Sequence, residues 1–142
     1  MTSVSEIRIN KILLIDDSRI EQLMYRRIID RAGIVDEVVA FSYAEDALNH
    51  LANARDDWPN IILLDINMPR MDGFEFIAAM EDRLGTQGLP IVMMLTTSLD
   101  PSDEVRASQT PLITDFLVKP LTEDDLIGMA NMLLDRRSTA GA

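Results

Sequence analysis

Short runs of apolar residues recur along the chain and alternate with segments of a different kind. Five of these runs are candidate strands: 11–15, 37–41, 61–64, 91–95 and 116–118. Four are almost continuously apolar, which is typical of strands buried on both faces of a parallel sheet. The run 37–41 is less uniformly apolar, and we expect it at an edge of the sheet.

The segments between the runs carry signals that begin helices. Several resemble a capping box, in which a Ser, Thr or Asp side chain and an acidic residue three positions later bind each other's backbone N–H groups. One segment instead has an Asp-Pro pair, which is typical of an N-cap followed by proline at the first helical position. In chain order the signals are Ser18-x-x-Glu21, Ser42-x-x-Glu45, Asp72-x-x-Glu75, Asp100-Pro101 and Thr122-x-x-Asp125.

Five strands therefore alternate with five helices. This alternation predicts an α/β fold with right-handed crossovers and a doubly wound, mostly parallel sheet. We expect one domain over residues 11–136, with an N-terminal extension at 1–10 and a frayed tail at 137–142. Apolar residues also recur at helical spacing in the first and last helices: Ile20, Leu23, Met24 and Ile28, and then Leu126, Met129, Ala130, Leu133 and Leu134.

Composition narrows the possible partners. The 142 residues include 13 Lys and Arg against 24 Asp and Glu, a net charge of −11. This charge argues against binding to nucleic acid or anionic membrane, which both attract positive charge. There is no cysteine, so disulfides and thiolate sites are excluded. The longest apolar stretch, 89–95, is far shorter than the ~20 residues of a membrane helix. The first ten residues do not resemble a signal peptide, and we expect a cytoplasmic protein.

Polar residues follow the predicted strands at the points where chemistry is expected. In open α/β sheets, ligands bind beyond the carboxyl ends of the strands. The strand ends carry Asp16 and Asp17, then Asp65, Thr96 and Lys119. Each alone has an ordinary explanation as a turn, cap or surface residue. Their joint occurrence at four strand ends instead predicts a site.

Three neighbouring carboxylates repel one another unless one is protonated or a cation joins them. Oxygen ligands without His or Cys favour Mg²⁺ or Ca²⁺, and Mg²⁺ commonly uses one or two carboxylates together with a phosphate. Lys119 would offset the charge of an incoming phosphoryl group, and the Thr96 hydroxyl would hydrogen-bond to it. One aspartate is then available as a nucleophile that forms an acyl phosphate.

These residues resemble the receiver domain of two-component response regulators, and most of all stand-alone receivers of the chemotaxis type. Four motifs, in the family's order, carry the resemblance over nearly the whole chain: Leu13 to Asp17, Ile62 to Gly73, Leu95-Thr96 and Phe116 to Pro120. The resemblance implies a flavodoxin-like sheet with strand order 2-1-3-4-5.

The resemblance also implies roles for individual residues. Asp65 would accept the phosphoryl group and bind Mg²⁺ together with Asp17, while Asp16 would act largely through water. The backbone carbonyl of Asn67 would complete the protein ligands. Lys119 would pair with the phosphoryl group, and the Lys119-Pro120 peptide would be cis. Thr96 and Phe116 would act as the switch that responds to phosphorylation. Asn67 and Ser98 would tune the lifetime of the phosphoryl group.

Two features depart from the family pattern. The stretch 108–114 lacks the Ala-Gly pair common before the fifth strand and is one residue longer. This difference affects the fourth helix and the loop after it, which belong to the usual output face. Phe116 stands where many receivers have Tyr, so activation here cannot use a phenolic hydroxyl.

The sequence leaves two outputs open. No attached effector domain fits in the chain, so we expect a protein that does not bind DNA and is no enzyme beyond its own phosphorylation and dephosphorylation. It would either bind a protein target through the face of the fourth helix, fifth strand and fifth helix, or pass phosphate to a histidine phosphotransfer protein. A partner histidine kinase would dock on the first helix, where Arg19, Ile20, Leu23 and Met24 are candidates. The spacing leaves open whether Leu23 and Met24 lie in the core.

Other classes fit less well. A phosphatase of the haloacid dehalogenase type needs Asp two positions after the nucleophile as acid and base, but this position is Asn67. A flavin carrier of the same topology needs a Ser/Thr/Gly-rich phosphate loop, where this chain has Asp16 and Asp17. A receiver that is never phosphorylated would not need the full set of site residues.

Overall fold

The computed structural model describes residues 8–97 and 100–140. Five strands form one parallel sheet in the order β2-β1-β3-β4-β5. The strands are β1 (Ile9–Ile15), β2 (Val35–Phe41), β3 (Ile61–Asp65), β4 (Ile91–Thr96) and β5 (Ile113–Val118). The predicted fold class and strand order are therefore confirmed.

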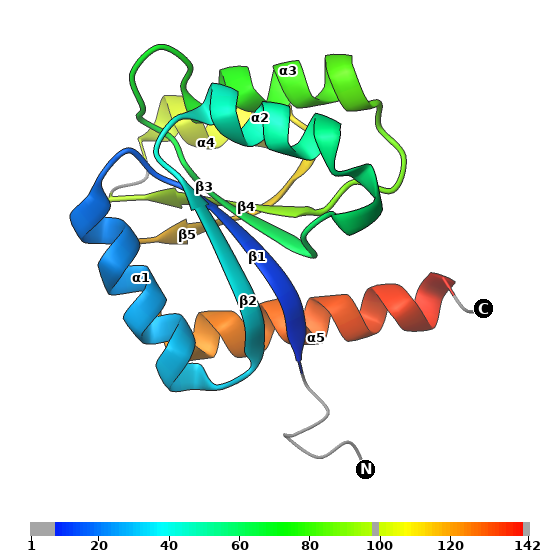
Figure 1. The fold of residues 1–142 in the computed structure, drawn as a ribbon. Coiled ribbons are helices and arrows are strands. Elements are labelled where there is room, and N and C mark those ends of the chain that lie inside the picture. Colours follow the sequence, from blue (N-terminus) through cyan, green and yellow to red (C-terminus); the bar gives the residue numbers. More distant parts are fainter. Residues whose placement is uncertain (1–7, 98–99, 141–142) are drawn as a thin grey trace.

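Helices cover both faces of the sheet (Figure 1). They are α1 (Arg19–Ala32), α2 (Ala44–Asn53), α3 (Gly73–Leu84), α4 (Pro101–Ser108) and α5 (Glu123–Ala140), with a short 3₁₀ turn η2 (Arg55–Asp57) after α2. One face packs against α1 and α5, and the other packs against α2, α3 and α4. Within the described part of the chain, no helix is long and apolar enough to cross a membrane.

Side-chain alternation along the strands builds two cores. In β1, Leu13 and Ile15 point into the core shared with α2 and α3, while Ile12 and Leu14 point into the core shared with α1 and α5. Every residue of β3 and β4 is buried, whereas β2 and β5 are half-exposed. Three of the four continuous apolar runs are thus inner strands that are covered on both faces, and β2 is an edge strand as predicted. The fourth run, 116–118, belongs to β5, a half-exposed edge strand, so the expected burial on both faces is wrong there.

Most of the predicted helix starts are present. Ser18 and Asp100 cap α1 and α4 with their side chains, and α3 begins with a complete capping box. Thr122 and Asp125 bind each other's backbone N–H groups at the start of α5. The predicted cap at Ser42 is wrong.

The segment before α2 uses Ser42 differently. Helix α2 has Tyr43 at its N-cap position, without a side-chain cap. The Ser42 hydroxyl accepts a hydrogen bond from the Gln22 amide of α1 at 3.2 Å. The side chain that would have capped α2 is therefore engaged with another element.

Some boundaries also differ from those expected. Strand β1 begins at Ile9, within the segment predicted as an extension, and α5 continues to Ala140, past the predicted domain end at Arg136. The long stretch before β5 includes a register shift. Val92 pairs with Ile113 but Met93 pairs with Asp115, so Thr114 is the extra residue of an irregular edge strand.

Candidate functional site

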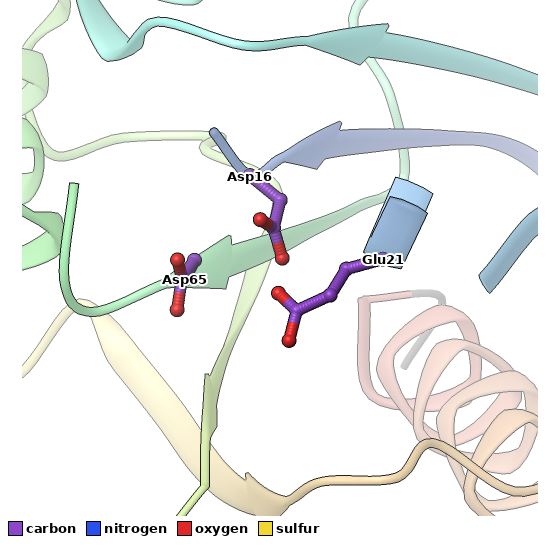
Figure 2. Close-up of side chains that lie close together, drawn as sticks. All are labelled: Asp16, Glu21 and Asp65. Carbon is purple, nitrogen blue, oxygen red and sulfur yellow. The ribbon is translucent and has the colours of Figure 1, made fainter. Parts of the chain in front are cut away.

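The carboxyl edge of the sheet, where β1, β3, β4 and β5 end, brings the predicted polar residues together. Asp16 follows β1 and is completely buried, and Asp65 ends β3 with 7% of its surface exposed. In Figure 2 the Asp16 carboxyl group points toward that of Glu21 from α1, and Asp65 lies beside them at the end of β3. One carboxylate oxygen from each of these three residues lies within 4.8 Å of the other two.

Lys119 lies in the middle of these carboxylates. Its Nζ is 2.8 Å from Glu21 Oε2, 3.2 Å from Asp65 Oδ1 and 3.6 Å from Asp16 Oδ2. The backbone positions this lysine, because the Lys119 N–H donates to the Thr96 carbonyl at 2.7 Å at the end of β4. The Lys119-Pro120 peptide bond that follows is cis, as the resemblance implied.

The loop after β3 is held by a close backbone contact with α3. The Gly73 N–H donates to the Ile66 carbonyl at 2.8 Å. A Cβ atom added at Gly73 would lie 2.7 Å from the Asp65 carbonyl oxygen, closer than real Cβ contacts. Only glycine lets α3 begin so near the phosphoacceptor candidate.

Burial and crowding shift the protonation of these groups. Burial raises the pKa of Asp16 to about 7, and a hydrogen bond with Glu21 and the charge of Asp65 act in the same direction. Burial also raises the pKa of Asp65, although Lys119 opposes this change. Burial disfavours the ionised form of Glu21, but hydrogen bonds with Asp16 and Lys119 outweigh burial and lower its pKa. The ionised carboxylates raise the pKa of Lys119 against the effect of its burial, which keeps the lysine charged.

In EDTA, we expect the free energy of unfolding to fall as the pH rises from about 4 to about 7. Asp16 loses its proton near pH 4 in the unfolded chain and near pH 7 in the folded protein, so the folded state binds more protons in this window. Urea unfolding at about pH 5 and about pH 7 should show a loss of about 2 kcal/mol. Asp16→Asn should flatten this dependence. An equally steep dependence in the variant would assign the proton to another group.

The site fits a hard cation. Asp16 Oδ2 is buried and, among the described residues, has no hydrogen-bond donor. An oxygen in this position is stabilised by a cation that meets several carboxylates at once. The available ligand atoms are all oxygens, which favours Mg²⁺ or Ca²⁺ over softer metals.

The other predicted site residues are placed as follows. Thr96 is buried at the end of β4. Asp17 and Asn67 are exposed beside the carboxyl edge, and the negative charge of Asp17 raises the pKa of Asp65. Phe116 is half-buried in β5 and packs against the core under α3 and α4. Ser98 lies outside the described residues, and its role stays a prediction.

Glu21 belongs to the site although the local sequence does not predict it there. The pattern Ser18-x-x-Glu21 predicts a capping box, an arrangement that would point the carboxylate at the backbone. The available signal was the place of Glu21 in the first turn of the helix that follows the aspartate pair.

Comparisons with known proteins identify the family of the chain. Residues 12–131 match the model of the family described as "Response regulator receiver domain". Protein PilH of Pseudomonas aeruginosa is 28% identical over 87% of this chain and 97% of its own. The transcription regulator BvgA of Bordetella pertussis is 30% identical over 88% of this chain, which spans only 56% of that regulator.

Solved structures show the same likeness. A two-component response regulator from Cytophaga hutchinsonii has a TM-score of 0.83 and 32% identity, with 90% of this chain and 98% of that chain covered. The chemotaxis protein CheY4 of Vibrio cholerae has a TM-score of 0.69 and 29% identity, with 87% and 97% covered. Because the family model matches most of the sequence, this chain belongs to the response regulator receiver domains of two-component signalling.

Proposed function

We propose that the protein accepts a phosphoryl group on Asp65 in a Mg²⁺-dependent reaction and thereby changes its affinity for a protein partner. The observation that carries the proposal is the buried Asp65 carboxylate at the end of β3, with the Lys119 ammonium group 3.2 Å away. The donor would be a histidine kinase or a histidine phosphotransfer protein. We expect the reaction in the cytoplasm, where such kinases obtain ATP.

The transfer needs few groups from the protein. An Asp65 oxygen would attack the phosphorus atom of a phosphohistidine, so that an O–P bond forms while the N–P bond breaks and the imidazole leaves with its electron pair. Lys119 would pair with the phosphoryl oxygens, and the Thr96 hydroxyl would donate a hydrogen bond to one of them. Positioning and charge thus account for the reaction, as is usual for phosphoryl transfer. We expect the protein to catalyse only its own phosphorylation and dephosphorylation, with Asn67 and Ser98 tuning the lifetime.

The residues that would hold Mg²⁺ are Asp65 and Asp17 directly, Asp16 through water, and the backbone carbonyl of Asn67. When bound, the ion supplies positive charge that offsets the carboxylates and the phosphoryl oxygens. The exposure of Asp17 supports its role as a direct ligand, because an exposed side chain can turn toward an ion from the solvent side.

Mg²⁺ should stabilise the protein measurably. At about 10 to about 100 times its Kd, the ion should raise the free energy of unfolding by about 1.4 to about 2.7 kcal/mol. Thermal unfolding with added Mg²⁺ measures this effect, and Asp17→Ala should reduce it. An unchanged melting temperature, or an equal shift in Asp17→Ala, would count against the assigned ligands.

The exposed face of α1 supports the proposed kinase contact. Ile20, Leu23 and Met24 are 72%, 61% and 49% exposed, while Tyr25 and Ile29 of the same helix are buried. Of the four apolar residues predicted at helical spacing in α1, Ile28 packs against the core and the other three are exposed, so this spacing by itself does not mark the core face. Exposed apolar side chains next to the site suit a partner that must bring its phosphohistidine to Asp65.

The output surface would be formed by α4, β5 and α5. Val105, Val118 and Ile127 are large exposed apolar residues, one on each of these elements. Phe116 of β5 would rotate inward when Thr96 moves toward the phosphoryl group, and this change would alter the surface. The alternative output is a phosphorelay shuttle that transfers phosphate to a histidine phosphotransfer protein.

Incubation with acetyl phosphate and Mg²⁺ tests the proposal. The intact mass should increase by one phosphoryl group, and omission of Mg²⁺ should prevent the gain. The two outputs differ when a histidine phosphotransfer protein is added, because only a shuttle would lose its phosphoryl group to the added protein. Beryllofluoride, which mimics a phosphoryl group, serves as a second probe in the presence of Mg²⁺. The proposal would be contradicted if acetyl phosphate left the mass unchanged and beryllofluoride did not bind.

A further inference from the structure

Glu21 contacts Lys119 more closely than the phosphoacceptor candidate does. The Lys119 Nζ lies 2.8 Å from Glu21 Oε2 and 3.2 Å from Asp65 Oδ1. The Lys119 side chain is 11% exposed and that of Glu21 is 32% exposed, so the ion pair is partly shielded from water. An ion pair that is shielded from water restricts the direction of the lysine side chain more strongly than an ion pair on the surface does.

The start of α1 explains why the Glu21 carboxylate is available. In a complete capping box this carboxylate would accept from the Ser18 N–H, as Glu75 accepts from the Asp72 N–H at the start of α3. Here the Ser18 N–H donates to Asp16 Oδ1 at 2.8 Å. Ser18 Oγ still accepts from the Glu21 N–H at 3.2 Å, so half of the capping arrangement remains. The buried Asp16 thus replaces Glu21 in the cap, and the Glu21 side chain turns into the site.

Without Lys119, electrostatic repulsion would disfavour the placement of the Glu21 carboxylate in the site. Glu21 adds a third carboxylate to Asp16 and Asp65, all within 4.8 Å of one another. Lys119 contacts all three. A phosphoryl group on Asp65 brings further negative charge and needs the same ammonium group. The carboxylate of Glu21 and the phosphoryl oxygens therefore compete for one cation.

We propose that Glu21 is a positioning residue that holds Lys119 in the unphosphorylated protein and releases it when a phosphoryl group binds. The competition would lower the affinity of the site for phosphoryl groups and set how strong a donor is needed. This inference rests on the proposed function and extends it to a residue of α1. It also places the control of Lys119 beside the apolar face that a kinase would contact.

A double-mutant cycle tests the first half of the proposal. The four proteins are the wild type, Glu21→Gln, Lys119→Met and the double variant, with Glu81→Gln, an exposed position of α3, as the matched control for loss of one charge. Urea unfolding in EDTA should show that Glu21 and Lys119 are coupled by roughly tenfold in the unfolding equilibrium constant. Glu81→Gln should show no coupling to Lys119. Additive effects of Glu21→Gln and Lys119→Met would overturn the proposal.

Beryllofluoride binding at saturating Mg²⁺ tests the second half, with ¹⁹F NMR as the readout. If the anion displaces Glu21 from Lys119, removal of the Glu21 charge should strengthen beryllofluoride binding. Linkage then requires Glu21→Gln to bind the anion more tightly by the same factor as the coupling, roughly tenfold. Unchanged or weaker binding by Glu21→Gln would overturn the proposal. A wild type that binds no beryllofluoride would instead contradict the proposed function, and any remaining coupling in EDTA would then show an ion pair with a structural role only.

Discussion

Asp65→Asn should take up no phosphoryl group from acetyl phosphate and Mg²⁺ under conditions in which the wild type is modified. The amide is a poor nucleophile, and it also removes the negative charge next to Lys119. The side chain keeps its size at a position that is 7% exposed, so the fold should persist. Intact mass and a phosphate-affinity gel measure the uptake, and circular dichroism verifies folding.

Lys119→Ala is the companion variant for this experiment. It keeps the nucleophile but removes the cation, so the uptake rate should fall about 100-fold or more while Asp65 remains the acceptor. The two variants separate the role of Asp65 as the attacking nucleophile from the role of Lys119 in stabilising the negative charge of the phosphoryl group. A modified Asp65→Asn protein would move the acceptor to another side chain, with Asp16 and Asp17 as the first to test.

Gly73→Ala should be the most damaging small substitution near the site. The new Cβ would lie 2.7 Å from the Asp65 carbonyl oxygen and 3.1 Å from the Ile66 Cα. Both are backbone atoms, which cannot turn away as the end of a side chain can. We expect the free energy of unfolding to fall by about 1 to about 3 kcal/mol. Because relief of the clash moves the end of β3, phosphoryl uptake on Asp65 should also slow.

Gly128→Ala provides a matched control. This glycine lies in α5, and a Cβ there would meet nothing within 4 Å. Alanine favours the helix over glycine, so this variant should gain about 0.5 to about 1 kcal/mol and keep its uptake rate. Urea unfolding of the two variants side by side gives the comparison. Equal stability changes would show that the Gly73 contact does not constrain the loop after β3.

The fold and most of the site follow from the order of the residues along the chain. The inner strands are continuous apolar runs because both of their faces are covered, and the alternation of strands with helices favours a parallel sheet with crossover connections. In that topology the strands end at the same edge. The approach of Asp16, Asp65, Thr96 and Lys119 to one another therefore follows from their positions in the chain alone.

The direction in which individual side chains turn depends instead on how the folded elements pack. The Ser-x-x-Glu patterns at Ser18 and Ser42 are alike in sequence, but neither forms a complete box. Asp16 accepts from the Ser18 N–H and leaves Glu21 free to meet Lys119, and Gln22 donates to the Ser42 hydroxyl. A local pattern states which partners a side chain can have, but Lys119 and Gln22 reach Glu21 and Ser42 from distant segments of the chain.

The same reason applies to α1. Helical spacing of Ile20, Leu23 and Met24 shows that they share a face, but it does not say what that face meets. Tyr25 and Ile29 form the opposite stripe, which is buried against the sheet and α5. Ile20, Leu23 and Met24 therefore stay exposed. Two apolar stripes on one helix are equivalent in sequence. The packing of distant elements selects which one becomes core and which one remains available to a partner.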